Sequence, residues 1–209
     1  MVAAMHSNPA FRATTRDSNI DFARSRGFGM LAVSHEERVL VSHIPFVLND
    51  AGTSVEGHLA KNNPIVAMLH RSRPATLVIS GSDSYVSPDW YDSPGNVPTW
   101  NYIAVHLRGV LTLGDSEALP QHLDRLSHHF ETQIPGKPPW TPAQLEPSAL
   151  QRMARAIVAI TLDVEGVEGT WKLSQNKDPG ARHHAAAEIS RHSLGQETGV
   201  LAQSMDSVD

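Results

Sequence analysis

Twelve of the 209 residues are histidine, a residue type that binds metals and transfers protons near neutral pH. Two pairs are adjacent in the sequence, His128 with His129 and His183 with His184. Adjacent residues on a helix point about 100° apart, so neither pair forms a chelating face like that of an i, i+4 pair. We therefore predict no metal site and interpret most of these histidines as solvated side chains.

Other common catalytic signatures are missing from the sequence. It has no cysteine, which excludes disulfides, thiolate metal ligands and a cysteine nucleophile. It contains no G-x-S-x-G nucleophile elbow, no Walker loop and no Rossmann glycine fingerprint. The acidic pair Glu36 and Glu37 lies in turn-like sequence and is interpreted as solvated. No catalytic residue is therefore assigned.

Three polar and aromatic stretches are harder to explain as plain scaffold. The first combines SHIPF (42–46) with GHLAKNNP (57–64), where predicted strand ends carry His, Ser, Lys and Asn. The second, SYVSPDWYDSPGNVPTWNY (84–102), holds all three tyrosines and two of the four tryptophans. The third is WKLSQNK (171–177). Each alone is compatible with a capped loop and an aromatic plug, but together they predict a binding site.

The first half of the chain is predicted to contain short strands and helices that position these stretches. From apolar runs and alternation we predict strands at residues 28–34, 39–44, 53–60 and 75–81. The S-x-x-D pattern at Ser18 predicts the start of a helix, and Gly27 predicts its end. Asn63 and Pro64 predict a further short helix with Asn63 as its N-cap.

The second half continues the same pattern. Beyond the aromatic stretch, alternation through Ile103, Val105 and Leu107 predicts a long half-buried strand. Leucines at helical spacing predict an amphipathic helix within about 115–132, and 155–169 reads as a last strand before a helix at 181–193. Strands outnumber helices and hairpins outnumber crossovers, which favours a mainly β (α+β) fold, an antiparallel barrel with peripheral helices.

Composition is typical of one globular domain. We expect a single domain over residues 1–195 and a flexible C-terminal tail over 196–209. The net charge of −5 and the lack of a Lys/Arg cluster give no support to direct DNA binding. No apolar run approaches the roughly 18 residues that cross a bilayer, and no signal peptide is recognisable. We expect no membrane association and a cytoplasmic location.

The motifs GHLAKNNP, YVSPDWY, VPTWNY and KLSQNK occur in this order, at spacings that resemble the PaiB-like family of FMN-binding negative transcriptional regulators. The resemblance covers roughly residues 10–193. It implies a split β-barrel of the type found in flavin reductases and pyridoxamine-phosphate oxidases. It also implies a homodimer with FMN in the cleft between the subunits.

The same resemblance indicates which residues to consider for FMN. Lys61 and Asn62, at the start of a predicted helix, suit the phosphate. Trp90 and Trp100 suit the flavin ring, and Asn101 suits its polar edge. The full set of candidate cofactor-binding residues is Ser42, His43, His58, Lys61, Asn62, Trp90, Trp100, Asn101, Lys172, Ser174, Gln175 and Asn176. The last four are expected to reach the flavin of the second subunit.

Three functions stay open at this point. The leading hypothesis is an FMN-binding negative regulator that acts through a protein partner or through metabolism, because no DNA-binding motif is evident. The second is an FMN-dependent oxidoreductase using NAD(P)H or a related donor. The third is a heme-binding or heme-degrading split barrel, which the surplus histidines make conceivable.

Overall fold

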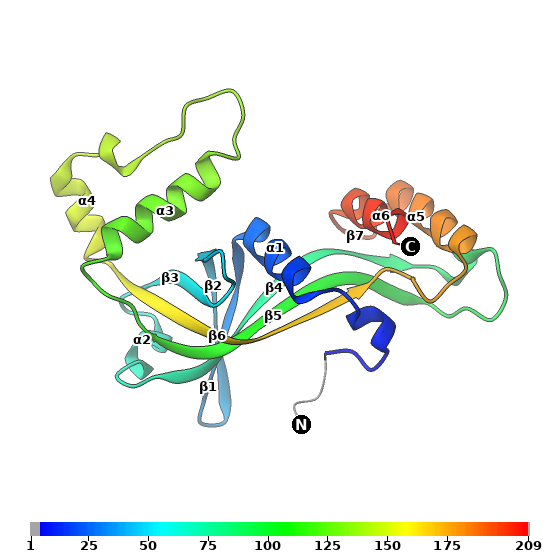
Figure 1. Cartoon of the computed structure of the whole chain (residues 1–209), viewed down its shortest axis with the longest axis horizontal. Helices are drawn as coiled ribbons and strands as arrows, with labels where there is room; N and C mark the ends of the chain where they lie inside the picture. Colours follow the sequence, from blue (N-terminus) through cyan, green and yellow to red (C-terminus); the bar gives the residue numbers. More distant parts are fainter. Residues whose placement is uncertain (1–4, 209) are drawn as a thin grey trace. The chain divides into compact units, whose positions relative to one another are not determined.

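Antiparallel strand pairing closes six strands of this chain into a ring. The structure, a computed structural model, describes residues 5–208. In those residues the strand order is β1-β2-β3-β6-β5-β4-β7, and a further β1–β4 pairing closes the ring (Figure 1). The strands are β1 (Phe28–His35), β2 (Arg38–Leu48), β3 (Ser54–Ala60), β4 (Arg73–Val86), β5 (Thr99–Leu113), β6 (Ile157–Lys172) and β7 (Gly195–Gln196). The predicted antiparallel split barrel with peripheral helices is therefore confirmed.

The register of the barrel follows from alternation of apolar side chains. Leu31 of β1 pairs with Leu77 of β4, and both are buried in the core. On β5 every second residue from Asn101 to Leu111 is buried, as the sequence pattern predicted. Because side chains alternate between faces with period 2, this pattern places one face of each strand inside the barrel.

Short helices complete the fold. They are α1 (Arg16–Arg26), α2 (Pro64–Met68), α3 (Leu119–Glu131), α4 (Pro147–Ala154), α5 (Pro179–His192) and α6 (Thr198–Asp206), with 3-10 turns η1 (Pro9–Arg12), η2 (Pro88–Tyr91) and η3 (Pro142–Gln144). Helices α2, α3 and α5 confirm the corresponding predictions. None of the helices in residues 5–208 is long and apolar enough to cross a membrane.

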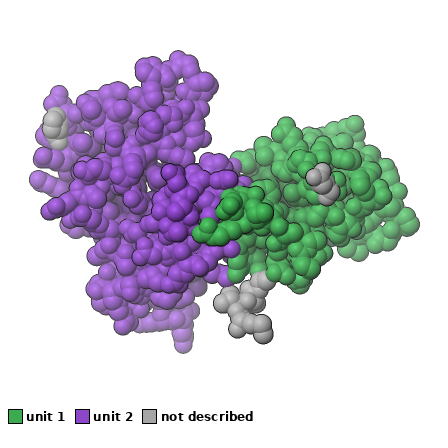
Figure 2. Space-filling view, viewed as in Figure 1, with its two compact units in different colours: residues 1–19, 80–105, 168–209 green, residues 20–79, 106–167 purple. Residues whose placement is uncertain are grey.

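The chain forms two compact units, which Figure 2 colours green and purple. Unit 1 comprises residues 1–19, 80–105 and 168–209, and unit 2 comprises residues 20–79 and 106–167. The long strands β4, β5 and β6 each contribute residues to both units. The closing β1–β4 pairing lies in unit 2, whereas the short strand β7 pairs with Asp83 and Ser84 of β4 in unit 1.

Helix α1 begins earlier than predicted. Thr15, and not Ser18, caps it, because the Ser18 backbone N–H donates to Thr15 Oγ1 at 3.1 Å. Ser18 therefore lies in the first turn of a helix that starts at Arg16. The predicted end is confirmed, since Gly27 takes the left-handed conformation (φ 56°) that terminates helices.

Two helices were not predicted. Residues 198–206, in the segment expected to be a flexible tail, form α6, whose Leu201, Ala202 and Met205 are buried. Helix α6 lies beside α5 in Figure 1, and the Arg182 guanidinium of α5 donates to the Val208 carbonyl. Helix α4 follows the proline-rich connection after α3. Both helices are short, and packing rather than intrinsic propensity stabilises such helices.

Candidate functional site

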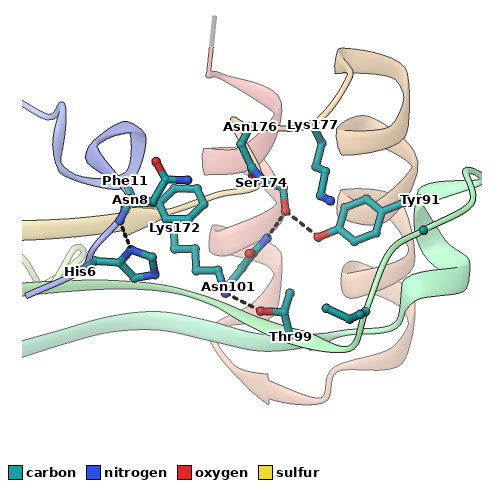
Figure 3. Close-up of a pocket in the computed structure, with 12 residues that line it drawn as sticks. His6, Asn8, Phe11, Tyr91, Thr99, Asn101, Lys172, Ser174, Asn176 and Lys177 are labelled. Atoms are coloured by element: carbon teal, nitrogen blue, oxygen red, sulfur yellow. Dashed lines mark hydrogen bonds between the residues drawn. The ribbon is translucent and has the colours of Figure 1, made fainter.

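In unit 1, a buried hydrogen-bond network centred on Ser174 joins two of the polar and aromatic stretches. The Tyr91 hydroxyl and Ser174 Oγ are 2.7 Å apart, and Asn101 Nδ2 donates to Ser174 Oγ at 2.8 Å (Figure 3). Tyr91 ends η2, Asn101 lies on β5, and Ser174 follows β6. All three side chains are buried. Residues more than 70 positions apart therefore meet in one polar cluster.

Local backbone geometry presents the Ser174 hydroxyl to this network. Ser174 has φ 61°, a left-handed conformation that non-glycine residues seldom adopt. The side chain of Gln175 holds the turn, because its Oε1 accepts from Leu173 N at 2.8 Å and its Nε2 donates to the Trp171 carbonyl at 2.5 Å. Both polar atoms of the Gln175 side chain are thus hydrogen-bonded to the backbone of residues 171–173.

Two lysines flank the network. Lys172 Nζ donates to Thr99 Oγ1 and stands 6.0 Å from the centroid of the Phe11 ring. Lys177 Nζ donates to Asn96 Oδ1 at 2.6 Å and stands 5.2 Å from the Tyr91 ring. Burial lowers the pKa of Lys172 from its usual value.

A cavity of about 260 Å³, called here the Ser174 cavity, opens between these residues. Its lining includes Phe11, Tyr91, Asn101, Lys172, Ser174 and Lys177. Within the described part of the chain, Asn101 Oδ1 is buried without a hydrogen-bond donor. An unpaired buried acceptor costs about 1–3 kcal/mol, so the network is not optimised for stability alone.

The two candidate tryptophans lie apart from this cavity. Trp90 stacks on His192 of α5 with ring centroids 5.2 Å apart, and Tyr85 contacts Trp90 and Trp100 edge-on at 6.3 and 6.4 Å. Trp100 is 50% exposed, whereas its neighbour Asn101 is buried. Alternation along β5 places these two neighbours on opposite faces. Asn176 lines the cavity and is exposed.

The remaining candidates lie in unit 2, where Ser42 and His43 sit on β2. Ser42 Oγ accepts from Asn63 Nδ2 at 2.9 Å, and Asn63 Oδ1 accepts from Ile65 N to cap α2. The exposed His43 ring stacks on Phe28, with centroids 6.2 Å apart. Ser42 therefore supports the predicted N-cap of α2.

Lys61 and Asn62 are exposed in the turn between β3 and α2. Lys61 lines a cavity of about 360 Å³, called here the Lys61 cavity, together with Ser116 and Arg155. Within residues 5–208, the side chains of Lys61 and Arg155 make no hydrogen bond or ion pair. Both positive charges are therefore available to an anion.

His58 is held by a histidine of α3. His58 Nδ1 and His122 Nε2 are hydrogen-bonded at 3.2 Å, and His122 Nδ1 lies 3.6 Å from Glu56 Oε2. The Arg125 guanidinium donates to the same Glu56 carboxylate. Burial lowers the pKa of both histidines, and the neighbouring His58 lowers that of His122 further.

Because the pKa values of His58 and His122 are lowered, we expect acid to destabilise the folded protein. In the unfolded chain each of these histidines takes up a proton near pH 6.5, whereas in the folded protein both stay neutral down to a lower pH. Below pH 6.5 the unfolded state therefore binds more protons than the folded state does. The free energy of unfolding should fall as the pH drops below 6.5, by at most about 1.4 kcal/mol per pH unit for each histidine and only until the folded histidine itself takes up a proton, and the pair should contribute little slope above pH 6.5. Urea unfolding between pH 5 and 7.5 measures this slope.

His122→Gln should reduce the slope, whereas the matched variant of an exposed histidine, His70→Gln, should keep it. A His122→Gln protein with the wild-type slope would contradict the assignment of the acid effect to this pair.

Comparison with known proteins identifies the family. Residues 5–166 match the family described as "Putative FMN-binding domain". The chain belongs to this family. The predicted PaiB-like FMN-binding family, and FMN as its cofactor, are therefore confirmed. The match spans three of the four motifs, since residues 172–177 lie beyond it.

Relatives of this FMN-binding domain include Protease synthase and sporulation protein PAI 2 of Bacillus subtilis (strain 168). It is 28% identical over 170 residues, which are 80% of this chain and 81% of that protein. The structure of the FAD and heme binding protein from Mycobacterium smegmatis has a TM-score of 0.58 at 16% identity, covering 88% of this chain and 82% of that one. Conserved hypothetical protein Rv2991 from Mycobacterium tuberculosis has a TM-score of 0.57 at 13% identity, covering 80% and 91%. At these identities the two structures establish the fold alone.

Sequence reasoning missed several residues that line the two cavities or contact a candidate residue in this FMN-binding domain. Tyr91 and Lys177 lie inside the quoted motifs YVSPDWY and KLSQNK, so the motif itself was a sufficient signal. His122, the partner of His58, and Arg155, beside Lys61, gave no signal, because both lie far from the motifs in the sequence. Among residues 5–208, no group of three or more His, Asp or Glu side chains is placed to hold a metal ion.

Proposed function

We propose that this chain is an FMN-binding, PaiB-like regulatory protein. Lys61 carries the FMN part of this proposal. Lys61 lines a cavity together with Arg155, and its ammonium has no partner within residues 5–208. An FMN phosphate carries a charge near −2 and takes charge-assisted hydrogen bonds from such groups.

These residues fit the phosphate better than they fit any other part of FMN. Asn62 and Ser116 add neutral hydrogen-bonding groups at or beside the cavity. The helix dipole contributes little, because α2 has only five residues and Asn63 already caps it. Side-chain charge, rather than a helix N-terminus as the sequence suggested, would therefore hold the phosphate.

A whole FMN molecule needs more space than either cavity offers. FMN has about thirty non-hydrogen atoms, which at the packing density of a protein interior fill roughly 600 Å³. The Lys61 cavity measures about 360 Å³ and the Ser174 cavity about 260 Å³. We therefore propose that FMN lies in a cleft between two copies of the chain, with only its phosphate end in the Lys61 cavity.

In such a homodimer the exposed tryptophan of the partner is a suitable cover for the flavin ring. Trp100 is 50% exposed on β5 and is braced by Tyr85. Lys172 and Asn176 remain candidates for the polar edge of the ring. Asn101 and Ser174 are buried and bonded to each other, and Gln175 is bonded to backbone, so their role as FMN ligands stays a prediction.

Bound FMN would supply hydride or electron transfer, and the residues near it would bind and orient it. No described residue pair is assigned as a catalytic acid and base. Regulation through a protein partner or through metabolism fits the net charge of −5 better than contact with DNA does.

FMN binding is tested by titrating the purified protein with FMN and recording its visible spectrum. We expect flavin bands near ~375 and ~450 nm, quenched flavin fluorescence on binding, and one FMN per subunit of a dimer. A protein that takes up no FMN, or binds it equally well as a monomer, would contradict the proposal. A Soret band that shifts and sharpens when heme is added to the protein would favour the heme alternative.

The regulatory role is tested separately. Deletion of the gene should change the expression of other genes, while the FMN-loaded protein should oxidise NAD(P)H no faster than free FMN does. Steady NAD(P)H turnover with an acceptor would instead favour the oxidoreductase.

A further inference from the structure

Helix α3 places His122 between two side chains of strand β3. Glu56 and His58 are two positions apart on β3, so their side chains project from the same face of the sheet. The His122 ring lies between them, with Nε2 3.2 Å from His58 Nδ1 and Nδ1 3.6 Å from Glu56 Oε2. The three side chains therefore form a row that runs from a carboxylate to the ring of His58.

The middle residue of this row is buried with one nitrogen unpaired. His122 is 3% exposed, and in the part of the chain that the structure describes its Nδ1 has no hydrogen-bond partner. Buried polar atoms in folded proteins are nearly always paired. The distance to Glu56 Oε2 exceeds a hydrogen bond by only about 0.5 Å. Because the Glu56 side chain is 41% exposed, a small rotation of its carboxylate closes this gap.

Electrostatics decides which ring nitrogens carry the protons. Burial lowers the pKa of both histidines, so at pH 7.5 each ring is neutral and carries one proton. A proton on His122 Nε2 would leave the lone pair of Nδ1 facing the Glu56 carboxylate, which is repulsive. A proton on His122 Nδ1 attracts the carboxylate instead and leaves Nε2 to accept from His58 Nδ1–H. The Nε2 of His58 is then an unprotonated acceptor.

The other charged groups around the row already have partners. A cavity of about 160 Å³, called here the His122 cavity, is lined by Glu56, His122, Asp115 and Arg125. Arg125 donates to the Glu56 carboxylate, and Asp115 Oδ1 accepts from the backbone N–H of Glu117 at 2.8 Å. Within residues 5–208 the half-buried His58 makes no hydrogen bond through Nε2. This nitrogen is therefore available to a ligand.

The row adjoins the cavity proposed for the FMN phosphate. Gly114 and Ala159 line both the His122 cavity and the Lys61 cavity. Ala159 of β6 is directly opposite His58 of β3 in the antiparallel ladder. Because directly opposite residues project from the same face of a sheet, the His58 ring lies on the face that borders both cavities. His58 also precedes Lys61 by three residues, so their Cα atoms are at most about 11 Å apart.

An acceptor at His58 selects among the chemical groups of FMN. The phosphate and the ring carbonyls offer only acceptor oxygens, which repel the lone pair of an unprotonated nitrogen. The donors of FMN are the hydroxyls of the ribityl chain and the N3–H of the flavin ring. The ribityl chain is attached to the phosphate, whereas N3–H lies at the opposite end of the molecule. A phosphate at Lys61 therefore leaves the ribityl hydroxyls as the donors nearest to His58.

We propose that Glu56 and His122 are positioning residues that hold His58 as the hydrogen-bond acceptor for a ribityl hydroxyl of FMN. This inference rests on the proposed FMN site with its phosphate at Lys61. It adds two residues that lie outside the first shell of the ligand, and it gives His58 the role of acceptor. A histidine so held contributes a directed hydrogen bond and no positive charge to the site.

NMR of the histidine side chains, recorded as proton–nitrogen correlation spectra of the FMN-free protein at pH 7.5, measures the tautomers directly. We expect His58 to be protonated at Nδ1 and unprotonated at Nε2, with its signals identified by their loss in His58→Gln. His128, which is exposed on the same helix as His122, should give the averaged signals of a ring that exchanges between tautomers. A His58 ring protonated at Nε2, or averaged like His128, would overturn the proposal.

Two variants test the positioning role. His122→Phe keeps a ring but removes the acceptor of His58 Nδ1–H, so the His58 signals should become averaged. Glu56→Gln removes the negative charge and should move both rings toward a mixture of tautomers; its partly exposed side chain keeps the test valid if His122→Phe does not fold. His128→Phe is the matched control and should leave His58 unchanged. A His58 tautomer that stays the same in the folded variants would overturn the role of Glu56 and His122.

Fluorescence titration with three flavins tests the group that His58 binds. FMN and riboflavin carry the ribityl chain, whereas lumiflavin lacks both ribityl and phosphate. His58→Phe should weaken FMN and riboflavin by the same factor, about 3- to 10-fold, and change lumiflavin binding less than about twofold. His128→Phe should change none of the three. Weakening of FMN alone would assign His58 to the phosphate, and equal weakening of all three would assign it to the ring; either result overturns the proposal.

Failure of the FMN site and failure of this inference are distinguishable, because the NMR measurement needs no flavin. A protein that binds no FMN but shows His58 protonated at Nδ1 would contradict the proposed function and the ribityl contact, and it would retain the row of Glu56, His122 and His58. A protein that binds FMN with His58 protonated at Nε2 would contradict this inference alone.

Discussion

Replacing Gly109 with alanine is expected to destabilise the protein strongly. Gly109 lies on β5, and a Cβ atom there would be 1.8 Å from the carbonyl oxygen of Asp163 and 2.8 Å from its carbonyl carbon. Both are backbone atoms of the neighbouring strand β6, so no side chain can rotate to relieve the overlap. The two strands would have to separate, which breaks ladder hydrogen bonds. Glycine within a strand often marks this kind of close approach.

The expected loss is about 3 kcal/mol or more of the free energy of unfolding, measured by urea titration. Gly166→Ala is the matched control, because Gly166 lies on β6 and a Cβ atom there would meet nothing within 4 Å. That variant should differ from wild type by less than about 1 kcal/mol. Equal stability of the two variants would show that β5 and β6 do not approach as closely as described.

Replacing Lys61 with alanine is expected to weaken FMN binding by about 10- to 100-fold. A hydrogen bond to a charged group is worth about 1.5–3 kcal/mol, which corresponds to this range of affinity. Riboflavin lacks the phosphate, so its affinity should change less than about twofold. The loss should also shrink as salt is added, since Lys61 is exposed and its charge is screened.

Fluorescence titration with both flavins measures the effect of this substitution. Lys137→Ala is the control for loss of an unrelated lysine, because Lys137 is paired with Glu131. Equal weakening of FMN and riboflavin would show that Lys61 does not contact the phosphate, and the phosphate would then have to be sought elsewhere.

The barrel was predictable because its strands have one buried face. Alternation through Ile103, Val105 and Leu107 on β5 identified a strand without any knowledge of its partner. The N-cap at Asn63 was equally clear, because capping depends on local side-chain chemistry. Helix α6 was not predictable, since its Leu201 and Met205 are buried only once α5 is in place.

The residues of the candidate site could be predicted from the sequence, but the contacts between them could not. Four motifs identified most of the residues around Ser174, yet only the fold shows that Tyr91 and Asn101 both bond its hydroxyl. His58 was assigned to the cofactor from its motif, whereas its hydrogen-bond partner His122 lies 64 residues away. Pairings between distant residues depend on strand order, which one sequence does not reveal.

The division of the chain into units also has a consequence for synthesis on the ribosome. Unit 2 is complete in sequence at residue 167, whereas unit 1 needs residues 168–209 for α5, α6 and Ser174. Domains fold as their residues emerge, and contacts between distant segments form slowly. The barrel can therefore close before the aromatic stretch of residues 84–102 can pack against residues 168–209. Until α5 is synthesised, Trp90 and Tyr91 lack part of the surface that covers them in the folded protein.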